Sequence, residues 1–342
     1  MPAAVYKGNH TVVVEDVPVP DIRPDQVLLR VSHCGICGTD LHLMIEDWGV
    51  PDSVGGHEYS GLVEVVGPAV EGWQPGDRAV GGPGRGCGVC AQCRAGRINL
   101  CVERRWEMGP SATGAFASYK AVDAASLYRV PDGLDLRTAA LTEPVAVALR
   151  GVRRSGATAA DRVLVTGAGP IGLLTVAALR AVGVEEITVS EPGGLRRERA
   201  GQVGATQTVT PDQLAQPAMP MDIVEFPFQV AFECSGRPDA MEAALANLDR
   251  AGTLVLSGTG MRRPRFDPNR IIMNELVVTG TAEYTPDDYD GSLDLLVSGR
   301  LPTTDLIEPE DVPLAGLHRA MERLAAGELA GKVLVVPDHG GR

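Results

Sequence analysis

The sequence lacks an excess of basic residues, a long apolar run and an apolar core at its N-terminus. Acidic residues outnumber Lys and Arg by 44 to 31, and the formal net charge is −13. Nucleic acid is therefore not an expected partner, because phosphate binding depends on clustered basic side chains. No apolar run is long enough to span a bilayer, and residues 1–7 lack the core of a signal peptide. We expect a cytoplasmic protein with no membrane contact.

Internal repeats and low-complexity segments are also missing. A length of 342 residues predicts about two domains. The 44% hydrophobic and 22% charged content is typical of globular proteins and excludes the disordered class. The first part of the chain consists of short strand-like runs between Gly- and Pro-containing turns, which predicts an antiparallel, barrel-like β domain. These runs are residues 11–16, 26–32, 60–66, 77–80 and 115–121.

The pattern changes near Leu136. Residues 136–153 predict one helix with Pro144 in its first turns, and strands then alternate with helices, which predicts a parallel, doubly wound sheet. The expected strands are 163–166, 187–190, 230–233, 254–257 and 276–279, and the expected helices are 171–181, 195–203 and 240–249. The last part of the chain predicts helices at 290–298 and 314–326 and a strand at 332–336, and we expect it to return to the first domain.

Four polar residue types gather in the segment from Gly35 to His42, and a second polar cluster, Gly55-Gly56-His57-Glu58, follows it. A soft thiolate and an imidazole suit Zn²⁺, and a catalytic zinc takes three protein ligands and keeps one position open. We infer that Cys37 and His57 are two such ligands. Cys34 and Cys37 also form a C-x-x-C, which is typical of a redox pair between a strand and a helix. A strand-like run precedes it but no helix–strand repeat follows, which favours zinc.

A cluster of four cysteines lies in a glycine-rich stretch, and the spacing is Cys87-x2-Cys90-x2-Cys93-x7-Cys101. Four thiolates can close a tetrahedral zinc site with no open position, which makes such a site structural. Two disulfides are the alternative, although they are rare in the cytosol, and an iron–sulfur cluster also takes four cysteines. The even spacing and the second apparent zinc site favour zinc.

A dinucleotide-binding motif follows the expected strand 163–166. It fits G-x-G-x-x-G and opens an apolar helix, so that its backbone N–H groups can approach a pyrophosphate at the helix N-terminus. The candidate residues are Gly167, Gly169, Pro170, Ile171 and Gly172. An acidic residue is expected about 20 residues on, where it binds the ribose hydroxyls, and Glu191 stands there. Its charge would repel a 2′-phosphate and favours NAD over NADP, although Arg196 and Arg197 nearby could accommodate that phosphate.

These four motifs, in this order and spacing, resemble the zinc-dependent medium-chain alcohol dehydrogenase family over essentially the whole chain. The resemblance implies a GroES-like antiparallel β catalytic domain at residues 1–145, with a structural zinc lobe at 82–104. It also implies a Rossmann NAD-binding domain at 146–283 and a C-terminal return at 284–342. One catalytic and one structural zinc per chain are expected.

The resemblance also implies residue roles. Cys37 and His57 take the places of catalytic zinc ligands, and Glu58 is an adjacent ligand or a carboxylate that supports one. Thr39 takes the place of the proton-relay hydroxyl, and His42 that of the histidine at the end of the relay in some members.

Glu143 stands at the position where the classical alcohol dehydrogenases of this family have a further cysteine that binds the catalytic zinc. This departure looks like the branch that contains sorbitol-type polyol, butanediol and threonine dehydrogenases. Glu143 would bind zinc directly or through water. The alternative is an ordinary glutamate that is stabilised by the dipole at a helix start.

The resemblance therefore implies hydride transfer from a secondary alcohol, polyol or vicinal diol to NAD, which gives the ketone. The alternatives are a primary-alcohol, formaldehyde-type or threonine dehydrogenase, or a zinc-stabilised NAD-binding protein without turnover. Trp48, Tyr59 and Trp106 are candidates to line the substrate pocket, or else they are packing aromatics. By analogy with the family, a homodimer or homotetramer is expected, with strand 276–279 pairing across a two-fold axis.

Overall fold

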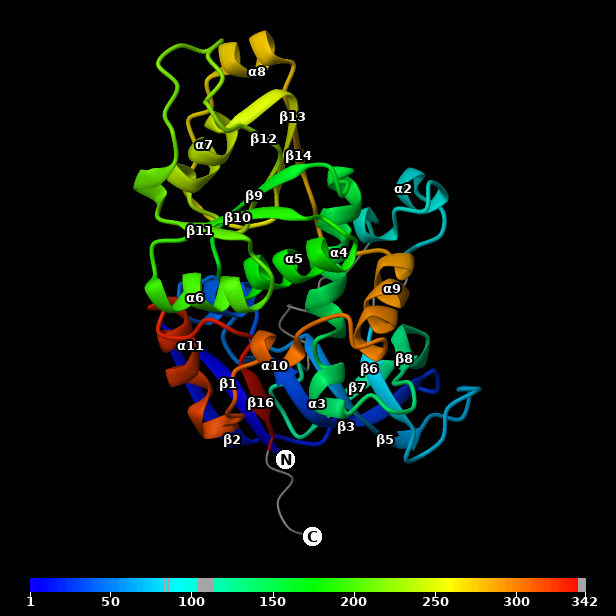
Figure 1. Cartoon of the computed structure of the whole chain (residues 1–342). Helices are drawn as coiled ribbons and strands as arrows, with labels where there is room; N and C mark the ends of the chain where they lie inside the picture. The colour runs from blue at the N-terminus through cyan, green and yellow to red at the C-terminus, as the bar shows by residue number, and fades with distance from the viewer. Residues whose placement is uncertain (83, 85, 104–113, 338–342) are drawn as a thin grey trace.

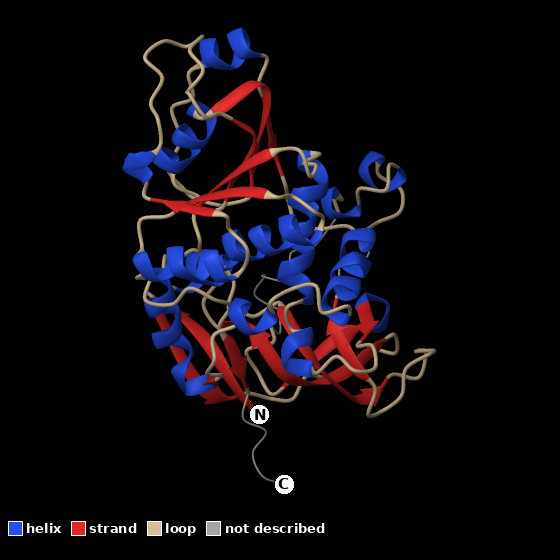
Figure 2. Ribbon diagram, in the orientation of Figure 1, coloured by secondary structure: helices blue, strands red, loops and turns tan. Residues whose placement is uncertain are grey.

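The computed structural model describes residues 1–82, 84, 86–103 and 114–337. Its antiparallel strands form one half of the molecule and its parallel strands, flanked by helices, form the other half (Figure 1). In Figure 2 the strands of the antiparallel half gather at the bottom and the parallel sheet lies above them between helices. Within the described residues, no helix is both long enough and apolar enough to cross a bilayer.

The antiparallel half is built around β3 (Gln26–Gly35). One edge of β3 pairs with β5. The other edge pairs with β7 along residues 26–30 and with β16 at residues 34–35. β3 is buried along most of its length because both of its faces are covered. The remaining strands of this half are β1 (Pro2–Gly8), β2 (Thr11–Asp16), β4 (Ser53–Val54), β5 (Glu58–Val66), β6 (Arg78–Gly81), β7 (Tyr119–Asp123) and β8 (Leu127–Arg129). The short helical elements here are α1 (Gly38–Met44), α2 (Ala91–Arg94), η1 (Ile98–Leu100) and η2 (Ala124–Ser126).

The parallel half is a sheet in the order β11-β10-β9-β12-β13-β14. The order reverses between β9 and β12, which creates the crevice where ligands bind at the carboxyl ends of such strands. The strands are β9 (Arg162–Thr166), β10 (Glu186–Ser190), β11 (Gln207–Val209), β12 (Phe228–Glu233), β13 (Leu248–Leu256) and β14 (Val277–Gly280). Its helices are α4 (Thr142–Ser155), α5 (Pro170–Ala181), α6 (Gly194–Gln202), η3 (Pro211–Gln213), α7 (Pro238–Ala246) and α8 (Pro268–Asn274). Antiparallel and parallel halves together confirm the predicted fold class.

The last part of the chain runs back over the antiparallel half. Leu334 pairs with Gly35, so β16 extends the sheet beside the segment that carries Cys37. The elements of this part are α9 (Pro286–Val297), α10 (Thr303–Leu306), β15 (Val312–Pro313), η4 (Leu314–Gly316), α11 (Leu317–Ala325) and β16 (Leu334–Val336).

Three predicted helices differ from the structure, and one of them, expected over 290–298, begins at Pro286 as α9. The helix expected over 136–153 is divided into α3 (Leu136–Ala139) and α4. In a continuous helix the Pro144 ring would clash with the carbonyl of Ala140. Because Pro144 has no N–H, that carbonyl would also lack its helical hydrogen bond, so a new helix begins shortly before Pro144. The helix expected over 240–249 ends at Ala246, and β13 begins at Leu248 rather than at 254. Asn247 ends the helix, since its side-chain amide donates to the carbonyl of Ala243, 2.9 Å away.

Candidate active site and metal centres

Cys37 lies in the bend between β3 and α1, and Asp40 fixes this bend. The Asp40 carboxylate accepts hydrogen bonds from the N–H of Cys37 at 2.9 Å and from the N–H of Gly56 at 3.3 Å. Its Oδ1 also lies 3.9 Å from His57 Nδ1. Asp40 is fully buried. One carboxylate therefore holds together the two polar segments that are distant in sequence.

The side chains of Cys37, His57 and Glu58 converge. One ligand atom from each lies within 4.8 Å of the other two. Burial lowers the pKa of His57, but the charges of Cys37 and Asp40 outweigh it and raise the pKa well above its usual value. Sulfur, imidazole nitrogen and carboxylate oxygen are a donor set that Zn²⁺ accepts.

Glu58 is fully buried and its two oxygens differ in their partners. Oε1 accepts a hydrogen bond from Lys332 Nζ at 2.7 Å. Oε2 has no hydrogen-bond partner among the described residues. Because an unpaired buried oxygen costs free energy, this atom suits a bound cation. The residues present thus fit a metal ion.

Glu143 lies in the first turn of α4 and borders the same site. It is 9% exposed, and burial, followed by the charge of Glu58, raises its pKa to about 7. His57 and Lys332 oppose this rise. The group of atoms within 4.8 Å of one another does not include Glu143. Its carboxyl is thus close enough to feel the site's charges but lies outside the three-residue cluster.

Thr39 and His42 lie on α1, on the side of the cluster toward the parallel sheet. Thr39 Oγ1 is 3.7 Å from Cys37 Sγ. His42 Nε2 is 3.3 Å from Oγ1 of Thr259, which follows β13. His42 therefore stands at the junction between the two halves of the molecule, where α1 meets the loop of the parallel sheet.

The aromatic candidates for the substrate pocket have different surroundings. The ring of Trp48 stacks on that of His42 with centroids 4.7 Å apart. Tyr59 is 4% exposed and packs within the sheet, with the ammonium of Lys120 5.3 Å from its ring centroid. Trp106 lies outside the described residues. Of the two described aromatics, Trp48 borders the junction and Tyr59 is a core residue.

The glycine motif forms the turn between β9 and α5. Gly167 has φ 91°, a backbone conformation that favours glycine. A Cβ on Gly172 would lie 2.0 Å from the carbonyl oxygen of Gly167, so helix and turn pack too closely for a side chain. Gly169 caps α5, and Pro170 and Ile171 form the first turn. The N–H groups at this helix start are available to a phosphate.

Glu191 lies at the end of β10, beside this turn, and is 5% exposed. Its carboxylate accepts hydrogen bonds from the N–H of Ala168 and from that of Gly193, both at 2.9 Å. Arg196 lies on α6 near the same turn, and its Nη1 is 4.0 Å from the place that a Cβ on Gly169 would take. Its Nε and Nη2 donate to the carbonyls of Leu329 at 3.1 Å and Leu324 at 2.8 Å, which ties α6 to the last part of the chain.

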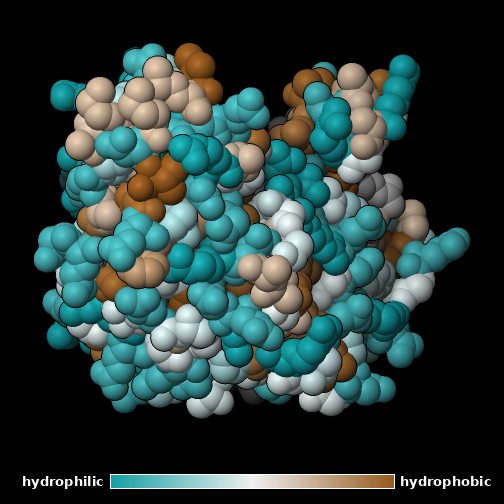
Figure 3. All heavy atoms as spheres, turned by 45° about the horizontal axis from the view of Figure 1, so that its top comes forward, coloured by the Kyte–Doolittle hydropathy of each residue, from teal (hydrophilic) through white to brown (hydrophobic). Residues whose placement is uncertain are grey.

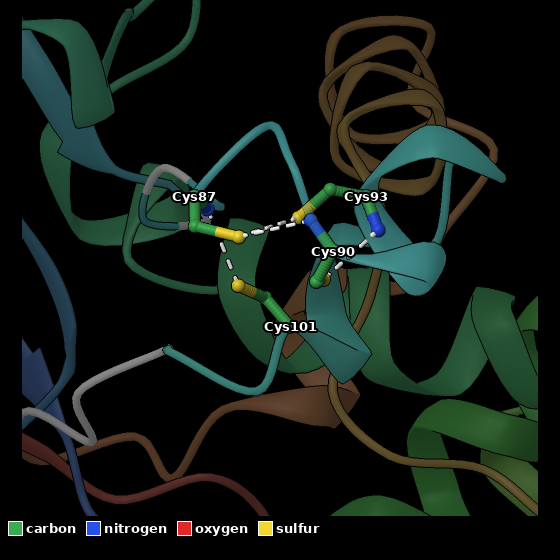
Figure 4. A group of neighbouring side chains, drawn as sticks. All are labelled: Cys87, Cys90, Cys93 and Cys101. Carbon is green, nitrogen blue, oxygen red and sulfur yellow. Dashed lines mark hydrogen bonds between the residues drawn. The ribbon is translucent and has the colours of Figure 1, made fainter.

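The four cysteines surround one point (Figure 4), and their sulfurs all lie within 4.8 Å of one another. Sγ of Cys87 and Sγ of Cys93 are 4.0 Å apart, close to the ~3.8 Å that tetrahedral Zn–S bonds produce and far beyond a disulfide. Backbone N–H groups point at three of the sulfurs, at 3.2, 3.3 and 3.4 Å. Hydrogen bonds from the backbone of Cys93 and Val102 lower the pKa of Cys90 to about 6. Burial raises the pKa of Cys93 to about 12, so the four thiols differ, and it is the spacing of the sulfurs that fits a metal ion.

The surroundings of the C-x-x-C segment argue against a redox pair. The helix α1 follows Cys37, but the next strands, β4 and β5, pair antiparallel and do not form a repeat of helices and parallel strands. The burial of Cys34 is a second argument. Its side chain is fully buried, and burial raises the pKa of its thiol well above the usual value. An inaccessible thiol with a high pKa is a poor redox partner.

Sequence reasoning missed Lys332 as a site residue and gave no role to Asp40. Asp40 had a local signal, since it stands between Cys37 and His42. Lys332 had none that pointed to Glu58, because 274 residues separate the two.

Comparisons with known proteins agree with this geometry. Residues 23–132 match the alcohol dehydrogenase GroES-like domain, and residues 170–298 match the zinc-binding dehydrogenase family. Sorbitol dehydrogenase of Bacillus subtilis is 33% identical, over 99% of this chain and 98% of the relative.

Solved structures extend the likeness to the fold. The 2R,3R-butanediol dehydrogenase of Bacillus subtilis is 30% identical with a TM-score of 0.86, over 98% of this chain and 99% of its own. A Sinorhizobium meliloti protein bound to NADP is 32% identical with a TM-score of 0.86, over 98% of this chain and 99% of its own.

Proposed function

Because the chain belongs to the family of zinc-dependent alcohol and polyol dehydrogenases, we propose that its site oxidises a secondary alcohol, polyol or vicinal diol to a ketone with NAD. The convergence of Cys37, His57 and Glu58 within 4.8 Å carries this proposal. Glu143, in place of a third cysteine, favours the polyol branch. Relatives named for sorbitol and butanediol support the same substrate class.

Cys37, His57 and Glu58 would hold the catalytic zinc, with Glu143 as a further ligand or as the partner of a bound water. Zinc there would supply Lewis-acid polarisation of the substrate hydroxyl. Asp40 orients His57 by binding the backbone on both sides of the site. Lys332 fixes one oxygen of Glu58 and leaves the other for the metal.

Thr39 and His42 would move the proton. Thr39 Oγ1 would accept it from the substrate hydroxyl and release its own proton toward His42 through the ribose hydroxyls of the cofactor, and His42 Nε2 would pass a proton to solvent. The 3.3 Å separation between His42 Nε2 and Thr259 Oγ1 supports a path that ends at the junction with the parallel half. The hydride chemistry is that of the nicotinamide, so the protein's part is to orient the carbon of the substrate.

The cofactor would lie along the turn from Gly167 to Gly172, with its pyrophosphate at the start of α5. Glu191 would accept hydrogen bonds from the ribose hydroxyls, and its charge favours NAD over NADP. Arg196 donates to backbone carbonyls of the last part of the chain through Nε and Nη2, and its Nη1 lies near Gly169, where a 2′-phosphate could approach it. The relative bound to NADP makes this preference the point to test first.

Cys87, Cys90, Cys93 and Cys101 would hold the structural zinc, since four protein ligands leave no open position.

The oligomer would form through β14, an edge strand of the parallel sheet. Val277 on β14 and Ile272 and Met273 on α8 are 50%, 71% and 51% exposed. Figure 3 shows a largely hydrophilic surface on which hydrophobic residues form separate patches. An apolar sheet edge of this kind suits pairing with a second copy, as a homodimer or homotetramer.

Reduction of NAD⁺ and of NADP⁺ by purified zinc-loaded protein tests the proposal. The substrates are sorbitol, xylitol, 2,3-butanediol, a simple secondary alcohol, a primary alcohol, formaldehyde and L-threonine. We expect chelator-sensitive turnover of polyols or diols with NAD⁺. Turnover of primary alcohols, formaldehyde or threonine alone would replace the substrate class. Unchanged turnover in Cys37→Ser would show that Cys37 is not a catalytic zinc ligand. Binding of NAD by the wild-type protein without any turnover would favour a binding protein.

A further inference from the structure

Asn99 links the four-cysteine lobe to the loop that borders the candidate active site. It lies in η1, between Cys93 and Cys101, and is 9% exposed. Its Nδ2 donates a hydrogen bond to the carbonyl oxygen of Ala282 at 2.8 Å, across 183 residues of sequence. Ala282 belongs to the loop between β14 and α9. One side-chain amide therefore joins the lobe to this loop.

Glu283, which follows that carbonyl, has a left-handed backbone with φ 50°. For a residue with a Cβ this conformation is unfavourable and persists only where its surroundings fix it. The carbonyl of Ala282 and the N–H of Glu283 belong to one rigid peptide plane. A hydrogen bond that fixes the orientation of the Ala282 carbonyl therefore fixes this peptide plane and restrains φ of Glu283.

The loop packs against α4, the helix that carries Glu143, and against the core; a Cβ on Gly151 of α4 would lie 3.7 Å from Cγ2 of Thr281 in this loop. The charge of Glu283 contributes, after burial and Glu58, to the raised pKa of Glu143. Tyr284 is 5% exposed, and its ring centroid lies 5.4 Å from that of Tyr289. A rotation about φ of Glu283 would shift its carboxylate and the Tyr284 ring relative to Glu143.

We propose that Asn99 is a positioning residue that holds the loop of residues 281–285 against the active site through the Ala282 carbonyl. The four-cysteine lobe thereby supports the part of the site that contains Glu143 as well as its own fold. The kinetic consequence rests on the proposed dehydrogenase function, whereas the ordering of the loop does not depend on it.

Asn99→Leu tests this role, because leucine keeps the size of the side chain and cannot donate. Loss of a hydrogen bond worth about 1 kcal/mol predicts about fivefold faster amide exchange in residues 281–285. We expect the KM for the alcohol to rise by a similar factor, with kcat, zinc content and NAD affinity changed less than about twofold. Arg97→Ala is the matched control, since it breaks an exposed 2.8 Å bond to Gln92 within the same lobe. It should leave exchange in the loop and KM unchanged.

A second substitution separates positioning from a merely structural role. Glycine adopts positive φ at little cost, so in a Glu283→Gly background Asn99→Leu should change the exchange and KM by less than about twofold. Asn99→Ser, too short to reach Ala282, takes the place of the leucine variant if that variant does not fold.

Two results would overturn the proposal. One is unchanged exchange in residues 281–285 of the Asn99 variants. The other is loss of zinc with fast exchange throughout the lobe, which would limit Asn99 to the fold of the lobe. If the wild-type protein turns over no alcohol, the proposed function fails, and the exchange measurements still decide whether Asn99 orders the loop.

Discussion

Lys332 and Glu58 form a buried ion pair that joins the end of the chain to the candidate metal site. Their atoms Nζ and Oε1 are 2.7 Å apart, and the side chains are 1% and 0% exposed. Nζ also donates to the carbonyl of Ile36 at 3.0 Å. The lysine therefore attaches the last part of the chain both to the segment before Cys37 and to the glutamate beside His57.

Lys332→Met is expected to destabilise the metal-free protein by about 3–5 kcal/mol, because it leaves a buried carboxylate without its partner. Urea unfolding measures the change. Lys7→Met is the control, since Lys7 pairs with Glu15 at 2.7 Å and both side chains are at least one-third exposed. Exposed pairs contribute about 0–1 kcal/mol. A loss in Lys332→Met no larger than in Lys7→Met would show that the buried pair does not support the fold.

Cys90→Ser is expected to lower the zinc content from about two ions per chain to about one. The remaining ion would stay at Cys37 and His57, which belong to a separate cluster. Metal analysis of the purified variant measures the content, and thermal unfolding should show a lower Tm because a structural zinc contributes directly to folding. Cys234→Ser is the control, since Cys234 belongs to neither cluster. Full zinc content in Cys90→Ser would exclude Cys90 as a ligand.

Glu191→Ala is expected to weaken NAD binding by about tenfold or more, since a hydrogen bond to a charged group is worth about 1.5–3 kcal/mol. NADP should be affected less, because removal of the carboxylate also removes its repulsion of the 2′-phosphate. Cofactor titrations followed by protein fluorescence measure both constants. Glu186→Ala, at the other end of β10 and paired with Arg162 at 3.1 Å, is the control. Equal losses for NAD and NADP would contradict the proposed cofactor preference.

The features that the sequence predicted have local signals, and those it missed depend on contacts across the chain. The four cysteines and the glycine motif are encoded by spacing within a short segment, so they could be read directly. The ion pair of Lys332 with Glu58 and the bond of Asn99 to Ala282 join residues 274 and 183 positions apart, and no local pattern marks them. The position of Arg196 after Glu191 indicated only that it could accommodate a 2′-phosphate. Its partners, the carbonyls of Leu324 and Leu329, are set by the packing of α6 against the end of the chain.

Removal of the metal should make stability depend on pH through Glu143. Its pKa is raised from 4.5 to about 7 in the folded protein, chiefly by burial and then by the charge of Glu58. Between these two values the folded state binds more protons than the unfolded state, so the free energy of unfolding falls as pH rises. The stabilisation of the protonated form is complete below about pH 4.5 and is lost as pH rises through about 7. Each pKa unit corresponds to about 1.4 kcal/mol, so the full change amounts to a few kcal/mol.

Urea unfolding of chelated protein across this pH range measures the slope, with Glu143→Gln as the comparison. Glutamine keeps the shape of the protonated side chain and cannot ionise, so the variant should lose the part of the slope that belongs to Glu143. Asp40 and His57 titrate in both proteins, and the difference between the profiles contains Glu143 together with the part of the His57 titration that depends on the charge of Glu143. If the free energy of unfolding depended on pH in the same way in the wild-type protein and in Glu143→Gln, Glu143 would ionise freely in the folded state. There would then be no reason to place its carboxyl beside Glu58 and the zinc site.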